Sequence, residues 1–155
     1  MSDLKQQLRT DLTAAMKSRD ALTLGTLRMV LAAITNEEVA GSTAKELTDP
    51  EVTTVLAREV KKRKESAEAF DGAGRTELAE RERAESAVIA AYLPQQLTDD
   101  EISSLVGESV AAVAASTGAA PTMKQMGLVI KDAQARAAGR AEGAKIAAAV
   151  KAALA

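Results

Sequence analysis

The chain has 155 residues, of which 20 are basic and 22 acidic, giving a formal net charge of −2. It contains neither cysteine nor histidine, so disulfides, thiolate chemistry, the most common general base and the most common zinc ligand are all excluded. Phe70 and Tyr92 are its only aromatic residues. The core must therefore consist of aliphatic side chains and alanine, a composition that favours helices.

The N-terminal segment predicts no targeting signal. Residues 1–5 lack the basic stretch followed by an apolar run that a secretory signal peptide has. No apolar stretch of the chain approaches the roughly 20 residues that a membrane-spanning helix needs. We therefore expect a cytoplasmic protein with no membrane contact.

The first 40 residues predict two helices. The first covers residues 2–18 with Ser2 as its cap, and the second covers residues 21–39 with Asp20 as its cap. Apolar residues recur at helical spacing in both, at Leu4, Leu8, Leu12 and Met16 and then at Leu24, Leu27, Leu31 and Ile34. The short connection between them implies an antiparallel helix pair.

Residues 48–91 predict a second pair of helices. Thr48 and Glu51 form a capping box, and Pro50 lies in the first turn, where its missing N–H has no consequence. This helix continues to about Phe70, the glycines within residues 71–74 end it, and a fourth helix follows to about residue 91. The apolar stripe of the third helix is Val52, Val55, Leu56, Val60 and Ala67, and that of the fourth is Leu78, Ile89 and Tyr92.

A boundary follows Tyr92. Pro94 disfavours helix in the residue before it, and a new capping box starts at once with Thr98 and Glu101. Three further helices follow, one ending before Gly118, one capped by Thr122, and one starting near Ala141. We expect an all-α protein divided into residues 1–92, a linker at 93–97, and residues 98–155.

Gly127 lies in the middle of the apolar stripe of the sixth predicted helix, whose other members are Met123, Met126 and Ile130. A glycine inside a helix costs about 1 kcal/mol relative to alanine. This cost would be offset if another helix crossed closely at this point, since the missing side chain would let the two backbones approach.

Charged residues lie on or beside the apolar stripes of three helices: Arg28, Glu59, Arg63, Glu82 and Glu85. Isolated charges at a helix–helix seam would be expensive, so we expect them to be paired. Glu59 and Arg63 are four residues apart, and we predict that Arg63 is buried and pairs with Glu59, Glu82 or Glu85 in a structural role. The alternative is an acid–base site formed by two of the carboxylates.

Two basic regions are candidates for phosphate contact. From Gly118 onward the segment carries a charge of +4, and its candidates are Lys124, Lys131, Arg136, Arg140 and Lys145. Gly143 opens the last helix, where free backbone N–H groups could hold a phosphate; a tight glycine turn is the alternative. The third helix places Arg58, Lys61 and Lys62 on its outward face, which we interpret first as an ordinary solvated face, with phosphate contact as the functional alternative.

The order of several short motifs resembles the GatB/YqeY family, which includes the tail of the B subunit of the tRNA-dependent amidotransferase and free-standing YqeY-type proteins. The matching stretches are residues 27–29, 59–64, 92–97, 123–127 and 139–143, with Glu142 standing where the family pattern has Asp. The resemblance implies an N-terminal antiparallel helical domain of about four helices and a C-terminal three-helix bundle. It also implies contact with the outer corner of tRNA. Glutamine hydrolysis and activation of the mischarged tRNA belong to domains that this chain lacks, so a carbon–nitrogen ligase label would describe the parent complex.

We therefore predict a tRNA-binding module that acts beside a tRNA amidotransferase or another aminoacyl-tRNA enzyme, with no catalytic residues, cofactor or metal of its own. A protein-interaction or regulatory module that does not bind RNA is the alternative. An enzyme using the seam carboxylates is a third hypothesis, which the missing histidine and cysteine oppose. The net charge of the whole chain is close to zero and aromatic residues are scarce, and both features argue against strong RNA binding by this chain alone.

Overall fold

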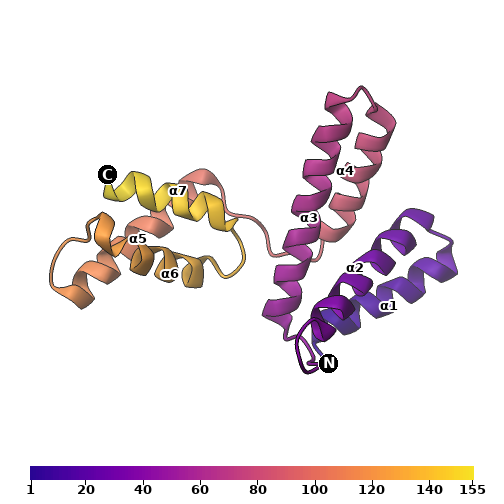
Figure 1. Ribbon diagram of the computed structural model, residues 1–155, viewed down its shortest axis with the longest axis horizontal. Coiled ribbons are helices and arrows are strands. Elements are labelled where there is room, and N and C mark those ends of the chain that lie inside the picture. The colour runs from indigo at the N-terminus through magenta and orange to yellow at the C-terminus, as the bar shows by residue number, and fades with distance from the viewer. The chain divides into compact units, whose positions relative to one another are not determined.

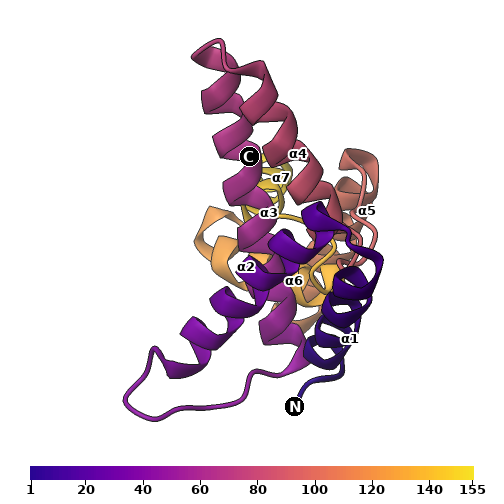
Figure 2. The same ribbon diagram turned by 90° about the vertical axis from the view of Figure 1, so that its right-hand side faces the viewer.

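The computed structural model describes residues 1–155 and contains only helices, with no strand (Figures 1 and 2). This confirms the all-α prediction. The elements are α1 (Asp3–Ser18), α2 (Ala21–Val39), α3 (Asp49–Gly72), α4 (Thr76–Ala90), α5 (Asp99–Thr117), the short 3-10 helix η1 (Met123–Gln125), α6 (Met126–Ala137) and α7 (Gly143–Leu154). None of them combines the length and apolar composition that crossing a bilayer requires.

The helices start where the capping residues predict. The Ser2 side chain accepts a hydrogen bond from the Lys5 N–H at 3.0 Å, and Asp20 accepts one from the Thr23 N–H at 3.1 Å. Thr48 and Thr98 each open a helix through a complete capping box. Caps involve residues within one turn of each other, which is why the sequence alone locates them.

The chain divides into two compact units, Met1–Leu93 and Pro94–Ala155. The first unit holds α1 to α4, where α1 packs antiparallel to α2 and α3 packs antiparallel to α4 (Figure 1). The second unit holds α5, η1, α6 and α7. Residues 94–97 belong to the second unit, where the Leu97 N–H donates to the Arg140 carbonyl at 2.7 Å. Separate folding of the two units stays a prediction.

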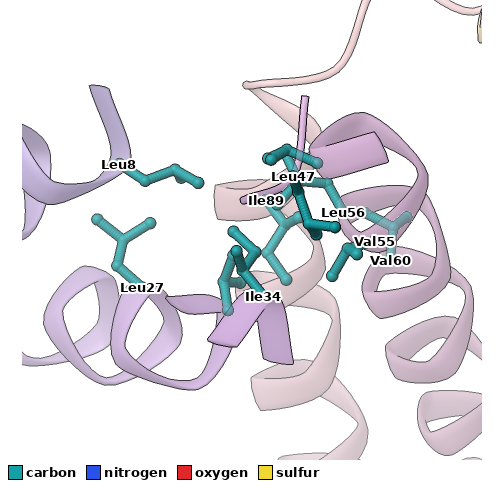
Figure 3. Close-up of a cluster of buried hydrophobic side chains, with 10 residues drawn as sticks. Leu8, Leu27, Ile34, Leu47, Val55, Leu56, Val60 and Ile89 are labelled. Carbon is teal, nitrogen blue, oxygen red and sulfur yellow. The ribbon is translucent and has the colours of Figure 1, made fainter. Parts of the chain in front are cut away.

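The core of the first unit joins side chains from all four helices. In Figure 3, Leu8 and Leu27 approach each other between α1 and α2, and Ile34 lies beside Ile89 and Leu56. Its buried members are Leu8, Leu27, Val30, Ile34, Leu47, Val52, Val55, Leu56, Val60 and Ile89.

Met16 was expected on the stripe of α1, but it is 52% exposed, and Ala15 is buried in its place. Positions four residues apart advance by about 40° around a helix, so after three such steps the side chain has turned away from the core. The fourfold spacing therefore overestimates the length of the buried stripe.

The second unit has its own core, whose buried members are Ile102, Val106, Val113, Val129, Ala133, Ala137, Ile146 and Val150. No helix crosses closely at Gly127. Gly127 is exposed, and no atom lies within 4 Å of the position that a Cβ would take there. Val129, Ala133 and Ala137 carry the buried face of α6, which leaves Gly127 pointing outward.

Candidate nucleic-acid interface

Two predicted phosphate contacts of the second unit, Arg136 and Arg140, are engaged within the unit itself. Arg136 Nε lies 2.6 Å from Asp132 Oδ2, and its Nη1 lies 3.6 Å from Glu108 Oε2. Arg136 donates this hydrogen bond to Asp132, which raises the pKa of Arg136 and lowers the pKa of Asp132. Arg140 Nε donates to the Gln95 carbonyl at 2.9 Å. Both arginines therefore hold parts of the unit together.

Lys145 and Gly143 lie at the start of α7 beside acidic residues. Lys145 Nζ is 3.8 Å from Asp99 Oδ1, and both side chains are well exposed. A pair this long at the surface contributes little to stability, so Lys145 remains accessible. Gly143 is the first residue of α7, and the N-cap residue is Glu142. A carboxylate at this position opposes an incoming phosphate, although the free N–H groups of the first turn would attract one.

The remaining candidates, Lys124 and Lys131, are exposed and form no ion pair or hydrogen bond. Leu128, at helical spacing between them, is 54% exposed, and the nearby Met123 is exposed as well. The acid of α6, Asp132, is turned aside, toward Arg136 and α5. Met123 and Lys124 of η1 lie beside Gly127, Leu128 and Lys131 of α6 in the sequence, and we call these five residues together the outer face of α6. Two unpaired cations and no acidic residue belong to this set.

The second unit as a whole is not basic, although the segment after Gly118 is. Pro94–Ala155 contains six basic and six acidic residues, so its formal charge is zero. The acids that offset the positive segment are Asp99, Asp100, Glu101 and Glu108, which all belong to α5. Any attraction for phosphate must therefore come from where the cations lie rather than from the net charge of the unit.

The candidates in the first unit, Arg58, Lys61 and Lys62, are exposed along α3. Arg58 Nη2 pairs with Glu37 Oε2 at 2.8 Å. Arg58 and Lys62 border a shallow depression between α2 and α3 that Glu37 and Glu59 also line. The charges of this surface are of mixed sign, which favours the solvated-face interpretation over phosphate contact.

The predicted ion pairs lie between α3 and α4. Arg63 is 6% exposed; its Nη1 is 2.6 Å from Glu59 Oε2, and its Nε is 3.4 Å from Glu85 Oε2. Glu85 also lies 3.4 Å from Arg81, and the Nη2 of Arg63 contacts the sulfur of Met29 at 3.8 Å. Arg63 is thus buried and paired as its spacing predicts.

Two members of the predicted set do not belong to this cluster. Arg28 is exposed and unpaired, because the buried face of α2 runs through Leu27, Val30 and Ile34 and places residue 28 on the opposite side. Glu82 is half-buried and forms no ion pair. It lies one turn before Glu85, nearer to the loop that joins α3 and α4. Arg63 is the one basic residue of α3 that is buried, and it pairs with Glu59 and Glu85 instead.

Sequence reasoning missed two polar contacts of the first unit. Lys5 Nζ lies 2.7 Å from Glu38 Oε2, and both side chains are largely buried. The Tyr92 hydroxyl donates to Asp11 Oδ2 at 2.6 Å. The partners are separated by 33 and 81 residues, so no spacing rule indicates them. The only signal for the first contact was that Lys5 lies near Leu8 on the buried side of α1, where a lysine needs an acidic partner.

Comparison with known proteins gives a family and two curated relatives. A family model described as Yqey-like protein matches residues 5–154. An uncharacterized protein of Schizosaccharomyces pombe is 34% identical over 98 residues, which cover 63% of this chain and 77% of that protein. The mitochondrial protein "altered inheritance of mitochondria protein 41" of Clavispora lusitaniae is 35% identical over 101 residues, covering 64% of this chain and 58% of that protein. Neither name describes a catalytic activity.

Proposed function

Because this chain belongs to the YqeY-like family over nearly its whole length, we propose that it is a tRNA-binding module without a complete active site. The observation that carries this proposal is the outer face of α6, where Lys124 and Lys131 are exposed and unpaired, while the adjacent Asp132 is paired with Arg136. The other cations of the same unit that could contact phosphate are mostly held by acceptors, above all Arg136 and Arg140.

The geometry of this face suits a phosphate backbone. Lys124 and Lys131 are seven positions apart, which corresponds to about 10 Å along a helix. Each lysine that neutralises a phosphate releases condensed counterions, so its contribution to affinity falls as salt rises. With a net charge of zero for the unit and −2 for the chain, we expect the binding to be weak and localised.

The resemblance to the tail of the amidotransferase B subunit supports tRNA as the nucleic acid. We propose that the chain acts in the cytoplasm beside a tRNA amidotransferase or another aminoacyl-tRNA enzyme. Glu59 and Glu85 both pair with the buried Arg63, and we assign a structural role to these carboxylates. Carbon–nitrogen ligation with glutamine as amide donor is then the activity of the partner.

We further propose that the two units are an N-terminal antiparallel helical domain and a C-terminal three-helix bundle that fold independently, with residues 93–97 as the connection. Each unit has a separate set of buried apolar residues, which supports this division. Limited proteolysis should cut near Gln95 and Gln96 before it cuts inside α3. First cuts within α3 would contradict independent folding.

A salt titration of tRNA binding tests the function. The full chain should bind tRNA at low salt, and the double variant Lys124→Ala/Lys131→Ala should lower the slope of log K against log salt by about 1.5. The matched control is Lys17→Ala/Lys64→Ala, which removes the same charge from exposed positions of the first unit and should leave the slope unchanged. No binding at low salt, or equal loss in both double variants, would contradict the proposal.

The second candidate function is a protein-interaction module, and the exposed side of α2 favours it. Leu22 is 40% exposed and Met29 is 44% exposed, and apolar surface that is contiguous can mark a protein-interaction site. If tRNA binding fails while Leu22→Ser/Met29→Ser abolishes capture of a protein from the native host, this candidate replaces the first.

A further inference from the structure

Gly127 has no role inside the fold. Its φ lies outside the left-handed region, so an alanine would fit the backbone conformation. No atom approaches within 4 Å of where a Cβ would stand, so an alanine would also fit the available space. Glycine weakens a helix relative to alanine. The fold itself therefore gives no reason for a glycine at this position.

The surroundings of Gly127 indicate what approaches it. Lys124 lies three positions before it and Lys131 four positions after it, so one unpaired cation stands about one turn away on each side. Leu128, directly after it, exposes 54% of its surface. This combination complements a polyanion whose sugar carbons can contact an apolar side chain while its phosphates contact lysines.

We propose that Gly127 is the point where the ribose–phosphate backbone of the bound RNA comes closest to α6. The absence of a side chain lets the RNA backbone lie against the helix, so that the ammonium groups of Lys124 and Lys131 reach phosphates on either side. A side chain at position 127 holds the RNA away and lengthens both contacts. This inference rests on the proposed tRNA-binding function and adds the residue that fixes the distance between helix and RNA.

The second unit offers a matched control in Gly107 of α5. It is also exposed within a helix, and it likewise has no atom within 4 Å of its missing Cβ. The structure gives no reason for a glycine there. Its nearest helical neighbours are Ser103, Ser104, Glu108 and Ala111, so no cation accompanies it. A polyanion therefore has no basic side chain to bind beside Gly107.

The test compares Gly127→Ala, Gly127→Gln and Gly107→Ala in the full chain. Both alanine variants should raise the thermal midpoint by about 2–4 °C, because alanine favours the helix. Only the variants at position 127 should weaken tRNA binding, measured by fluorescence anisotropy at low salt. We expect a loss of about fivefold for Gly127→Ala and a larger loss for Gly127→Gln, since the added atoms occupy the contact.

The outcomes separate this inference from the function on which it rests. If the wild-type chain shows no salt-dependent tRNA binding, both are overturned. If the wild type binds and the Lys124→Ala/Lys131→Ala variant weakens binding, but both variants at position 127 bind as tightly as the wild type, this inference alone is overturned. A stabilised Gly127→Ala protein with weakened binding supports it, because a folding defect cannot produce that combination.

Discussion

In the first unit charged side chains lie between helices and pair there, whereas in the second unit Lys124 of η1 and Lys131 of α6 are exposed without partners. Arg63 and Lys5 are both buried and both held by glutamates from their own unit. The second unit buries a single polar residue, Ser109, and otherwise has an apolar and alanine-rich core. The comparison teaches that a cation on an amphipathic helix stabilises the fold in one unit and remains available for a ligand in the other.

Of the substitutions that test this comparison, Arg63→Ala should lower the unfolding free energy most. Arg63→Ala leaves the buried carboxylates of Glu59 and Glu85 without their shared cation, and the loss of one partner from a buried pair costs about 3–5 kcal/mol. Urea unfolding followed by tyrosine fluorescence reports the first unit, because Tyr92 is the only tyrosine. The control Arg28→Ala removes an exposed, unpaired arginine and should change the unfolding free energy by less than about 0.5 kcal/mol. Equal effects of the two variants would contradict a structural role for Arg63.

The pair of Lys5 and Glu38 should make the stability of the first unit sensitive to acid. The hydrogen bond from Lys5 holds the pKa of Glu38 below its usual value of 4.5. Because the folded-state pKa is the lower one, the stabilisation is complete above pH 4.5 and is lost as the pH falls through the folded-state value. Glu38→Gln should cost about 2 kcal/mol at pH 7, since Gln keeps the shape but loses the charge-assisted hydrogen bonds.

The difference between wild type and Glu38→Gln should then shrink as the pH is lowered below 4.5, measured by urea unfolding at each pH. A difference that stays constant down to pH 2.5 would show that Glu38 does not titrate in this range. Other carboxylates contribute their own pH dependence, and the comparison with the variant cancels it.

The tyrosine that reports on the first unit also connects the segment after α4 to α1. The Tyr92 hydroxyl donates to Asp11, and burial together with this hydrogen bond raises the pKa of Tyr92. The hydroxyl therefore stays protonated and donating over the ordinary pH range. Tyr92→Phe should lower the unfolding free energy by about 1 kcal/mol in urea unfolding followed by circular dichroism. Asp11→Asn, which keeps an acceptor, should lose less; a larger loss for Asp11→Asn would assign the effect to something other than this hydrogen bond.

The structure shows which features a sequence can reveal and which it cannot. Helix starts at Ser2, Asp20 and Thr98 follow from caps that act within one turn, so they were predictable. The Arg63–Glu59 pair was predictable for the same reason, as its members are four residues apart. Contacts such as Lys5 with Glu38 depend on how separate helices pack, and no local pattern encodes them.

The candidate site was predictable as a set of residues but not as a surface. Lys124 and Lys131 could be named from the sequence. The spacing of Arg136 and Asp132 was also a signal for a pair, which sequence reasoning did not use, whereas the contact of Arg136 with Glu108 of α5 required the fold. The direction of Gly127 was misjudged because Met123 was taken as part of its helical stripe. In the structure a 3-10 turn precedes α6, and the buried face passes through Val129 instead.

The smallest expected effect concerns the end of α6 in the second unit. Ala138, the residue after the helix, has a φ of 49°, in the left-handed region where a Cβ is strained by about 1–2 kcal/mol. Glycine removes that strain but gives the unfolded chain more freedom, which offsets about 0.4–1 kcal/mol. Ala138→Gly should therefore stabilise the second unit by about 0.5 kcal/mol. The control Ala148→Gly changes an exposed residue in the middle of α7, where the same change should cost about 1 kcal/mol.

Circular dichroism should register both changes, and tyrosine fluorescence should register neither, because Tyr92 belongs to the first unit. If Ala138→Gly destabilises the protein as much as Ala148→Gly does, the left-handed end of α6 does not persist in solution. If these variants also shift the unfolding transition followed by tyrosine fluorescence, the two units do not unfold independently. The two units would then differ in how they use their charged side chains but would unfold together.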